Sequence, residues 1–251
     1  MRFVGDFHIH SKYARATSSA MVLENLDVWA KKKGIKVLGT GDFTHPAWFK
    51  ELQEKLEPAE EGLYKLRGSD SGARFVLSSE ISCIYSKKGR VRRIHLLLLV
   101  PSLQAAEHIN RRLDVRGNLK SDGRPILGID ATEVLKIALD ASPETLVIPA
   151  HAWTPWFSVF GSKSGFDSLE ECFDEYAKHI HAIETGLSSD PPMNWRLSAL
   201  DTIALISNSD SHSLAKIGRE ANVFDTELSY PGIRDAIVTK DPEKFLSTIE
   251  F

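Results

Sequence analysis

Short apolar runs alternate with amphipathic segments along most of the chain, and this alternation limits the folds open to it. The apolar runs predict strands at Phe3–Ile9, Ile35–Thr40, Arg74–Ser82, Arg92–Val100, Thr145–Ala150, Ala182–Thr185 and Thr202–Ser207. The segments between them predict helices at Met21–Lys33, Ala47–Leu56, Leu103–Leu113, Ala131–Ala141, Ser168–His179 and Met193–Leu200. Strands and helices in alternation favour a mainly parallel sheet or barrel.

Length and cysteine content favour a protein of the reducing cell interior. The 251 residues allow one large α/β domain or two small ones, with a core that needs no disulfide. Only two cysteines occur, Cys83 and Cys172, so we expect no disulfide framework and a cytoplasmic location. No apolar run reaches the ~18 residues that span a bilayer, and the first ten residues lack a signal-peptide core, so we expect no membrane partner.

The charge of the chain is unevenly distributed. A formal net charge of -3 does not indicate a nucleic-acid-binding protein, but ten Lys or Arg residues and three acidic ones lie between Lys87 and Arg124. A solvated face is one interpretation of this segment. A track for a phosphate backbone is the other. The polar, glycine-containing stretch Gly117–Gly128 within it is predicted to be a mobile loop.

Residue types that bind metal ions gather in or near the ends of the predicted strands. They are Asp6, His8, His10, Asp42, His45, Glu80, His95, His151, Glu184, Asp210 and His212. In an α/β barrel the C-terminal ends of the strands converge on one face. We therefore expect these side chains, although far apart in the sequence, to form one cluster.

Two pairs have a spacing that suits a shared ion. His8 and His10 are two residues apart in an extended segment, so both imidazoles point to the same side. Asp210 and His212 repeat this spacing after another apolar run. Asp42 has two interpretations, because it is a candidate ligand and also a candidate cap for the helix that Pro46 opens.

Glu80, His95 and His151 lie within or beside apolar runs. A carboxylate buried there is costly unless it is paired or bound to a metal ion. Either histidine, taken alone, is also consistent with a hydrogen-bonded core residue. Mixed imidazole and carboxylate ligands suit zinc, manganese or iron. Two such ions ~3.5–4 Å apart would contact the attacking and leaving oxygens of a phosphodiester.

The order His-x-His, Asp, Glu, His, His, Asp-x-His, running from His8 to His212, resembles the polymerase and histidinol phosphatase (PHP) superfamily. This resemblance implies a distorted (β/α)7 barrel and a single catalytic domain over residues 1–251. It also implies a metal-dependent phosphoesterase with two or three divalent ions, which would be zinc, manganese, magnesium or iron.

The same resemblance assigns a ligand set to each ion. The first ion would have four ligands, His8, His10, Glu80 and Asp210. Glu80 would bridge to a second ion that is also held by His95 and His151. A third ion would use Asp42 and His212. The expected catalytic residues are Glu80, Asp210 and His151.

The chain departs from the superfamily pattern around the third ion. Asp42, in Thr-Gly-Asp, stands where members usually have the His of Thr-Asp-His. Ala16 and Thr17 occupy a region that usually supplies a further ligand. His45 is a candidate replacement, and the third site is the least well supported of the three.

Four stretches are similar to the endonuclease Q family within this superfamily. They read DFHIHSKYARATS, LGTGDFTHP, IPAHAWTPW and SNSDSHS. The resemblance implies DNA repair, by a nick 5′ of deaminated bases (hypoxanthine, uracil or xanthine) or at abasic sites. The implied partners are damaged DNA and repair or replication clamp proteins. The Cys-rich zinc module that usually follows the barrel in this family has no counterpart in the sequence, which contains no Cys-x-x-Cys.

Aromatic and basic residues near the candidate ligands fit a DNA substrate. Trp48, Trp153 and Trp156 are candidate walls of a pocket for an extruded base, with core or lid packing as the alternative. The candidate phosphate contacts are Arg15, Lys87 and Arg90.

Two other functions remain open at the level of sequence. One is a small-molecule phosphatase of the histidinol-phosphate phosphatase type, although a small monophosphate needs fewer cations than the basic segment offers. The other is a metal-stabilised DNA-binding module without catalytic activity.

Overall fold

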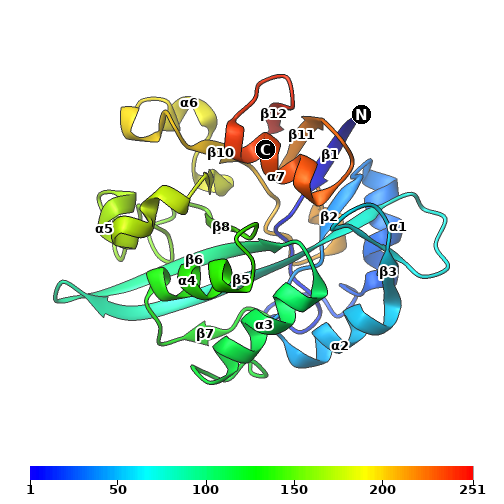
Figure 1. The fold of residues 1–251 in the computed structure, drawn as a ribbon, viewed down its shortest axis with the longest axis horizontal. Helices are drawn as coiled ribbons and strands as arrows, with labels where there is room; N and C mark the ends of the chain where they lie inside the picture. The colour runs from blue at the N-terminus through cyan, green and yellow to red at the C-terminus, as the bar shows by residue number, and fades with distance from the viewer. Residues whose placement is uncertain (251) are drawn as a thin grey trace.

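The computed structural model describes residues 1–250 and consists of one large mixed sheet, a small second sheet and seven α-helices within that range (Figure 1). The large sheet contains β1 (Arg2–Asp6), β2 (Val37–Gly39), β3 (Leu56–Pro58), β4 (Tyr64–Leu66), β5 (Arg74–Lys87), β6 (Arg90–Val100), β7 (Ile126–Leu127), β8 (Leu146–Pro149), β11 (Ala221–Asp225) and β12 (Phe245–Ile249). The small sheet pairs β9 (Ala182–Glu184) with β10 (Ala204–Ile206).

Several of the seven helices in the described range begin or end at ordinary capping signals. The helices are α1 (Leu23–Lys33), α2 (Pro46–Lys55), α3 (Leu103–Asp114), α4 (Ala131–Ala141), α5 (Leu169–Phe173), α6 (Pro191–Asn194) and α7 (Tyr230–Thr239). Ser102 and Asp130 cap α3 and α4 by accepting hydrogen bonds from backbone N–H groups of the first turn. Gly34 ends α1 with a φ of 73°, a conformation that glycine adopts without a steric penalty. No helix among residues 1–250 is long and apolar enough to cross a membrane.

The direction of the strands differs from the expectation of a mainly parallel sheet. β1, β2 and β5 are parallel neighbours, but β5–β6, β6–β8 and β1–β11 are antiparallel. The tight turn at Lys88 and Gly89 joins β5 directly to β6, and a connection this short allows only antiparallel pairing. The β5–β6 hairpin extends beyond the rest of the sheet (Figure 1).

The predicted α/β class is confirmed, whereas a closed (β/α)7 barrel is not observed. No sheet closes on itself within the part of the chain that the structure describes, because β9 and β10 pair only with each other. One apolar cluster nevertheless draws residues from eight strands, β1, β2, β5, β6, β8, β9, β10 and β11. These strands therefore surround a common core, although hydrogen bonds do not link them all.

The run Leu96–Leu99 shows how the sheet is buried. Leu97 and Leu99 enter the cluster that the strands surround, and Leu96 and Leu98 enter the larger cluster beneath the helices. Both faces of β6 are therefore apolar, which explains a continuous leucine run in place of an alternating pattern.

Two predicted segments have a different local structure. Gly117–Gly128 was expected to be mobile, but it contains β7 and is fastened by hydrogen bonds such as that from the Gly123 N–H to the Tyr13 carbonyl. The helix predicted at Ser168–His179 is split, because Asp174 has a φ of 51° between α5 and a 3₁₀ turn. Met193–Leu200 is likewise interrupted rather than one helix.

Candidate metal centre

The predicted cluster of His, Asp and Glu side chains forms where several strands end. His8 and His10 follow β1, His151 follows β8 and Asp210 follows β10. A single parallel bridge between Ile9 and Ser211 places the two chain segments side by side. Glu80 and His95 come from within β5 and β6, so their position depends on the hairpin rather than on strand ends.

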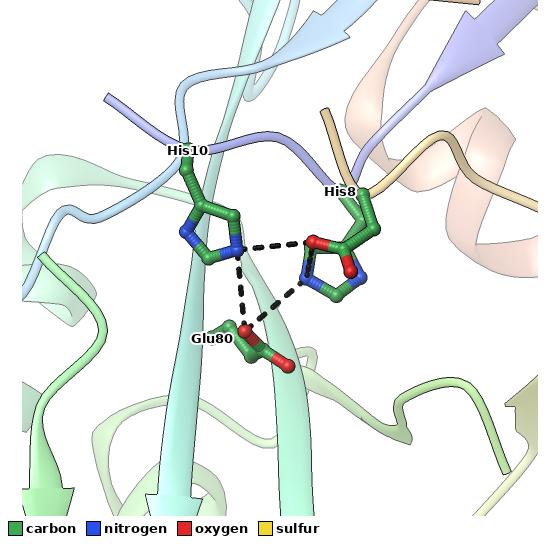
Figure 2. Close-up of side chains that lie close together, drawn as sticks. His8, His10 and Glu80 are labelled. Carbon is green, nitrogen blue, oxygen red and sulfur yellow. Dashed lines mark ion pairs between the residues drawn. The ribbon is translucent and has the colours of Figure 1, made fainter. Parts of the chain in front are cut away.

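Four side chains form the first group of candidate ligands: His8, His10, Glu80 and Asp210. Glu80 Oε2 lies 3.5 Å from Nε2 of His8 and 3.3 Å from Nε2 of His10. Asp210 Oδ1 lies 3.6 Å and 3.2 Å from the same two nitrogens. Figure 2 shows both imidazoles turned toward the Glu80 carboxylate.

Three atoms of this group fit a cation and have no other role among residues 1–250. Nε2 of His8, Nε2 of His10 and Oδ1 of Asp210 are buried without a hydrogen-bond partner. Buried polar atoms without partners are rare and need an explanation. A divalent ion between them would satisfy all three at once, and imidazole with carboxylate is a donor set that such ions accept.

Glu80 also belongs to a second group of candidate ligands, with His95 and His151. Its other oxygen, Oε1, lies 2.7 Å from Nδ1 of His95 and 3.1 Å from Nε2 of His151. One carboxylate therefore contributes an oxygen to each group, as a ligand bridging two ions would.

The remaining ring nitrogens are held by neighbours, which fixes the orientation of each imidazole. Nδ1 of His8 contacts both oxygens of Glu184 at 3.0 Å. The Ser82 hydroxyl contacts Nε2 of His95, and the Thr154 hydroxyl contacts Nδ1 of His151, each at 3.1 Å. Such partners set which nitrogen faces a metal ion.

Sequence reasoning noted Glu184 at a strand end but did not predict it as a site residue. Besides His8, it accepts hydrogen bonds from the His151 backbone N–H at 2.8 Å and the Asn208 side chain at 3.0 Å. Glu184 is fully buried, and a buried carboxylate in an apolar strand was the only signal in the sequence.

Asp42 and His212 both lie against His10 of the first group, and their role as ligands of a third ion stays a prediction. Oδ1 of Asp42 lies 3.0 Å from Nδ1 of His10, and its Oδ2 accepts hydrogen bonds from the backbone N–H and hydroxyl of Ser11, each at 2.6 Å. Nδ1 of His212 donates to the Asp210 carbonyl at 2.9 Å. Over residues 1–250, neither Asp42 nor His212 belongs to a group of three or more converging ligand atoms. Asp42 thus holds His10 from behind, and the His45 ring lies against Tyr13.

Electrostatics keep the two carboxylates and His95 in forms that bind cations, whereas the neighbouring carboxylates raise the pKa of His8, His10 and His151 against the opposing effect of burial. Burial alone would raise the pKa of Glu80, but His95, His8 and Arg124 together hold it well below its usual range. Burial opposes ionisation of Asp210 too, yet the nearby His8 and His10 lower its pKa. Burial lowers the pKa of His95 to about 4, which leaves its imidazole neutral. Ionised carboxylates and neutral imidazoles are the ligand forms.

Three site residues have a left-handed backbone. The φ angles are 49° at Asp42, 30° at His151 and 45° at Asp210. Residues other than glycine rarely adopt this conformation, which costs on the order of 1–3 kcal/mol and persists only where the surroundings enforce it. Their concentration here indicates that the fold maintains a specific geometry at the expense of stability.

A cavity of about 270 Å³ opens beside the second ligand group. His95 and His151 line one part, and Trp156 and Phe157 line another. Trp156 is 47% exposed, and the Arg93 guanidinium lies 4.8 Å above its ring. The predicted location of Trp156 beside the ligands is therefore observed.

The other two predicted aromatic contacts lie elsewhere. Trp48 is fully buried, and its indole N–H donates to the Gly41 carbonyl at 2.9 Å, so its prediction as a pocket wall was wrong. Trp153 packs on Phe160 and donates to Asn194, outside the residues that line the cavity. Core packing, the alternative interpretation, applies to Trp48.

The three residues predicted to contact phosphate differ in whether their side chains are exposed or already bound to other groups of the protein. Lys87 is engaged, because its ammonium donates to Asp174 at 2.8 Å and to the Cys172 carbonyl at 2.7 Å. Arg90 is exposed beside the turn of the β5–β6 hairpin. Arg15 is 77% exposed and its Nε lies 3.7 Å from Asp122. Arg15 and Arg90 are accessible to a substrate, whereas Lys87 is bound to the protein.

Comparison with known proteins gives relatives of this chain. No known family profile matches the chain. The uncharacterized protein YqxK of Bacillus subtilis is 31% identical over an alignment of 240 residues, and this alignment covers 88% of this chain and 58% of that protein. The chain thus spans somewhat more than half the length of this relative.

Two solved structures of endonuclease Q superimpose closely on the chain. The lesion-specific endonuclease PfuEndoQ of Pyrococcus furiosus superimposes with a TM-score of 0.86 and 32% identity over 99% of this chain and 58% of its own. A complex of endonuclease Q with a 27-mer duplex carrying an abasic lesion gives 0.83 and 34% over 94% of this chain and 56% of its own.

A more distant structure shares the fold alone. It is a putative metal-dependent phosphoesterase of Bifidobacterium adolescentis, with a TM-score of 0.53 and 14% identity over 83% of this chain and 87% of its own. These matches confirm the resemblance to endonuclease Q that the motifs predicted: the chain is similar to endonuclease Q over most of its length, and it shares its fold with the phosphoesterase structure.

Proposed function

We propose that the chain is a metal-dependent endonuclease that nicks DNA at lesions. The observation that carries this proposal is the position of Glu80, whose two oxygens each join a separate group of candidate ligands. The similarity to lesion-specific endonuclease Q supports the same chemistry.

The two groups would hold two divalent ions. His8, His10 and Asp210 would complete the site at one Glu80 oxygen, and His95 and His151 the site at the other. Such ions supply a water of lowered pKa and stabilise charge on the phosphoryl oxygens. With Asp42 engaged by His10 and Ser11, we propose two ions per chain rather than three, and metal analysis of the purified protein tests this number.

The cavity beside the second group suggests how a lesion would be held. Enzymes that act next to a damaged base hold the extruded nucleotide against aromatic side chains. Trp156 and Phe157 offer such a wall within the cavity that His151 also lines. Arg15 and Arg90 would contact the DNA backbone outside it, because both are exposed.

The substrate we propose is duplex DNA with a deaminated base (hypoxanthine, uracil or xanthine) or an abasic site, cut on the 5′ side. One related structure contains a duplex with an abasic lesion at the active site, and another is described as lesion-specific. Repair or replication clamp proteins as partners and a cytoplasmic location stay predictions of the sequence.

The experiment is incubation of the protein with end-labelled duplexes, each with one inosine, uracil, xanthine or abasic site, beside an undamaged duplex. We expect a nick at the lesion with manganese, magnesium or zinc, none with a chelator, and none with Glu80→Ala. His108→Ala is the matched control, because His108 is exposed on α3 away from the ligands.

Other outcomes distinguish the remaining functions. Rapid hydrolysis of small monophosphates without nicking would indicate a phosphatase. Lesion-dependent binding without cleavage in any of the three metals would indicate a binding module. A fully active Glu80→Ala protein would end the assignment.

A further inference from the structure

Arg124 reaches the shared carboxylate from the segment Gly117–Gly128. Its Nη1 donates to Oε2 of Glu80 at 3.1 Å, the oxygen that also faces His8 and His10. The guanidinium is therefore a fixed positive charge beside the first ligand group.

The backbone around Arg124 is fastened to the site on both sides. Before it, the Gly123 N–H donates to the Tyr13 carbonyl at 3.0 Å, and after it, the Pro125 carbonyl accepts from the Ser82 N–H at 3.0 Å. A Cβ at Gly123 would lie 2.4 Å from Oδ2 of Asp42, so only glycine permits this approach. The segment thus holds Arg124 in place.

Most of the hydrogen-bonding capacity of Arg124 is unused. A guanidinium has five N–H donors in a planar fork. Among the residues that the structure describes, one side-chain hydrogen bond is formed, the bond to Glu80. The Arg124 side chain is 26% exposed, so the other donors are open to a ligand in the site.

We propose that Arg124 binds a non-bridging oxygen of the substrate phosphate. Cations on both oxygens of Glu80 would balance its charge and weaken its attraction for the guanidinium. The fork then suits a phosphate, which guanidinium groups bind through paired hydrogen bonds. This proposal rests on the proposed function for the phosphodiester substrate, but it requires only a phosphate beside the ligands.

The alternative role is structural, in which Arg124 merely positions Glu80. The two roles differ in what an uncharged substitution removes. Loss of a phosphate contact weakens phosphate binding and leaves the metal content unchanged. Loss of a positioning contact lowers the affinity of the site for metal, and phosphate binding falls with it.

The test uses metal-loaded protein and inorganic phosphate as the probe, measured by isothermal titration calorimetry, with metal content measured in parallel. We expect Arg124→Gln to weaken phosphate binding about tenfold or more, the loss of roughly 1.4 kcal/mol that a charge-assisted bond supplies. Arg124→Lys retains the charge but lacks the planar guanidinium, so its affinity for phosphate should lie between those of the wild type and Arg124→Gln. Arg116→Gln, an exposed change in the same basic segment, should bind as the wild type does.

Three results would overturn the proposal: wild-type protein that binds no phosphate, Arg124→Gln that binds it unchanged, or Arg124→Gln that loses metal in proportion. Phosphate binding that depends on Arg124 in a protein that nicks no lesion would refute the endonuclease and leave the phosphate contact standing.

Discussion

Glu184 places both carboxylate oxygens 3.0 Å from Nδ1 of His8, on the side of the ring away from the candidate ion. Glu184→Gln keeps the shape but removes the negative charge, so Nε2 of His8 should become a weaker donor. We expect metal affinity to fall about 10–100-fold, as measured by competition with a chromogenic chelator. Glu170→Gln, exposed on α5, is the control. Unchanged affinity would show that Glu184 serves only packing.

Trp156 is expected to matter for lesion recognition. Stacking of a base on an aromatic side chain contributes about 1–3 kcal/mol, so Trp156→Ala should weaken binding of an inosine duplex by roughly 5–150-fold. Fluorescence anisotropy of labelled duplexes in the presence of a chelator measures binding without cleavage. Trp195→Ala removes another exposed tryptophan, one that does not line this cavity. Equal losses in both variants would contradict a specific role for Trp156.

Gly123 should tolerate no side chain. The added Cβ of Gly123→Ala would meet Oδ2 of Asp42, and crowding of this kind costs about 1–3 kcal/mol. We expect a fall of several degrees in the melting temperature. Gly128→Ala is a matched control in the same segment, since a Cβ there has no neighbour within 4 Å. If the Gly123→Ala protein were as stable as the Gly128→Ala protein, the segment Gly117–Gly128 would have to shift away from Asp42 without cost.

Glu220 should make stability depend on pH. Burial raises its pKa to about 7, against the hydrogen bond from Ser207 and with the support of the Glu250 carboxylate. An unfolded glutamate titrates near about 4.3, so the folded chain retains a proton that the unfolded chain releases. The retained proton on Glu220 therefore gives its full stabilisation of the folded chain below the pKa of an unfolded glutamate. This stabilisation is lost as the pH rises through about 7.

The corresponding experiment is thermal unfolding of Glu220→Gln between pH 5 and pH 8. The variant should match the wild type at pH 5 and melt about 2–4 °C higher at pH 8, which corresponds to about 1 kcal/mol in a chain of this size. Glu243→Gln, which is exposed, should show no such trend. An increase in melting temperature that is equal at both pH values would exclude titration of Glu220 as its cause.

Local signals in the sequence predicted the elements that depend on local interactions. α3 and α4 were predicted within a residue, because Ser102 and Asp130 cap helices with regular apolar spacing. β11, α7 and β12 were not predicted. β11 pairs with β1 across more than 200 residues, and a pairing over that separation leaves no mark in a short segment.

The candidate site was predictable in its members but not in their roles. Spacing grouped His8 with His10, and the structure brings both to Glu80 and Asp210. The same reasoning could not separate a ligand from the residue that orients a ligand, because both are polar groups near strand ends. Asp42 was therefore assigned to an ion, and Glu184 was placed in the cluster without a role, although each holds an imidazole from behind.

The shared carboxylate of Glu80 has a consequence for how such a centre is gained or lost. Since one side chain belongs to both halves, its replacement takes a ligand from both at once. A descendant of this chain that replaces Glu80 should therefore lose both halves in a single step.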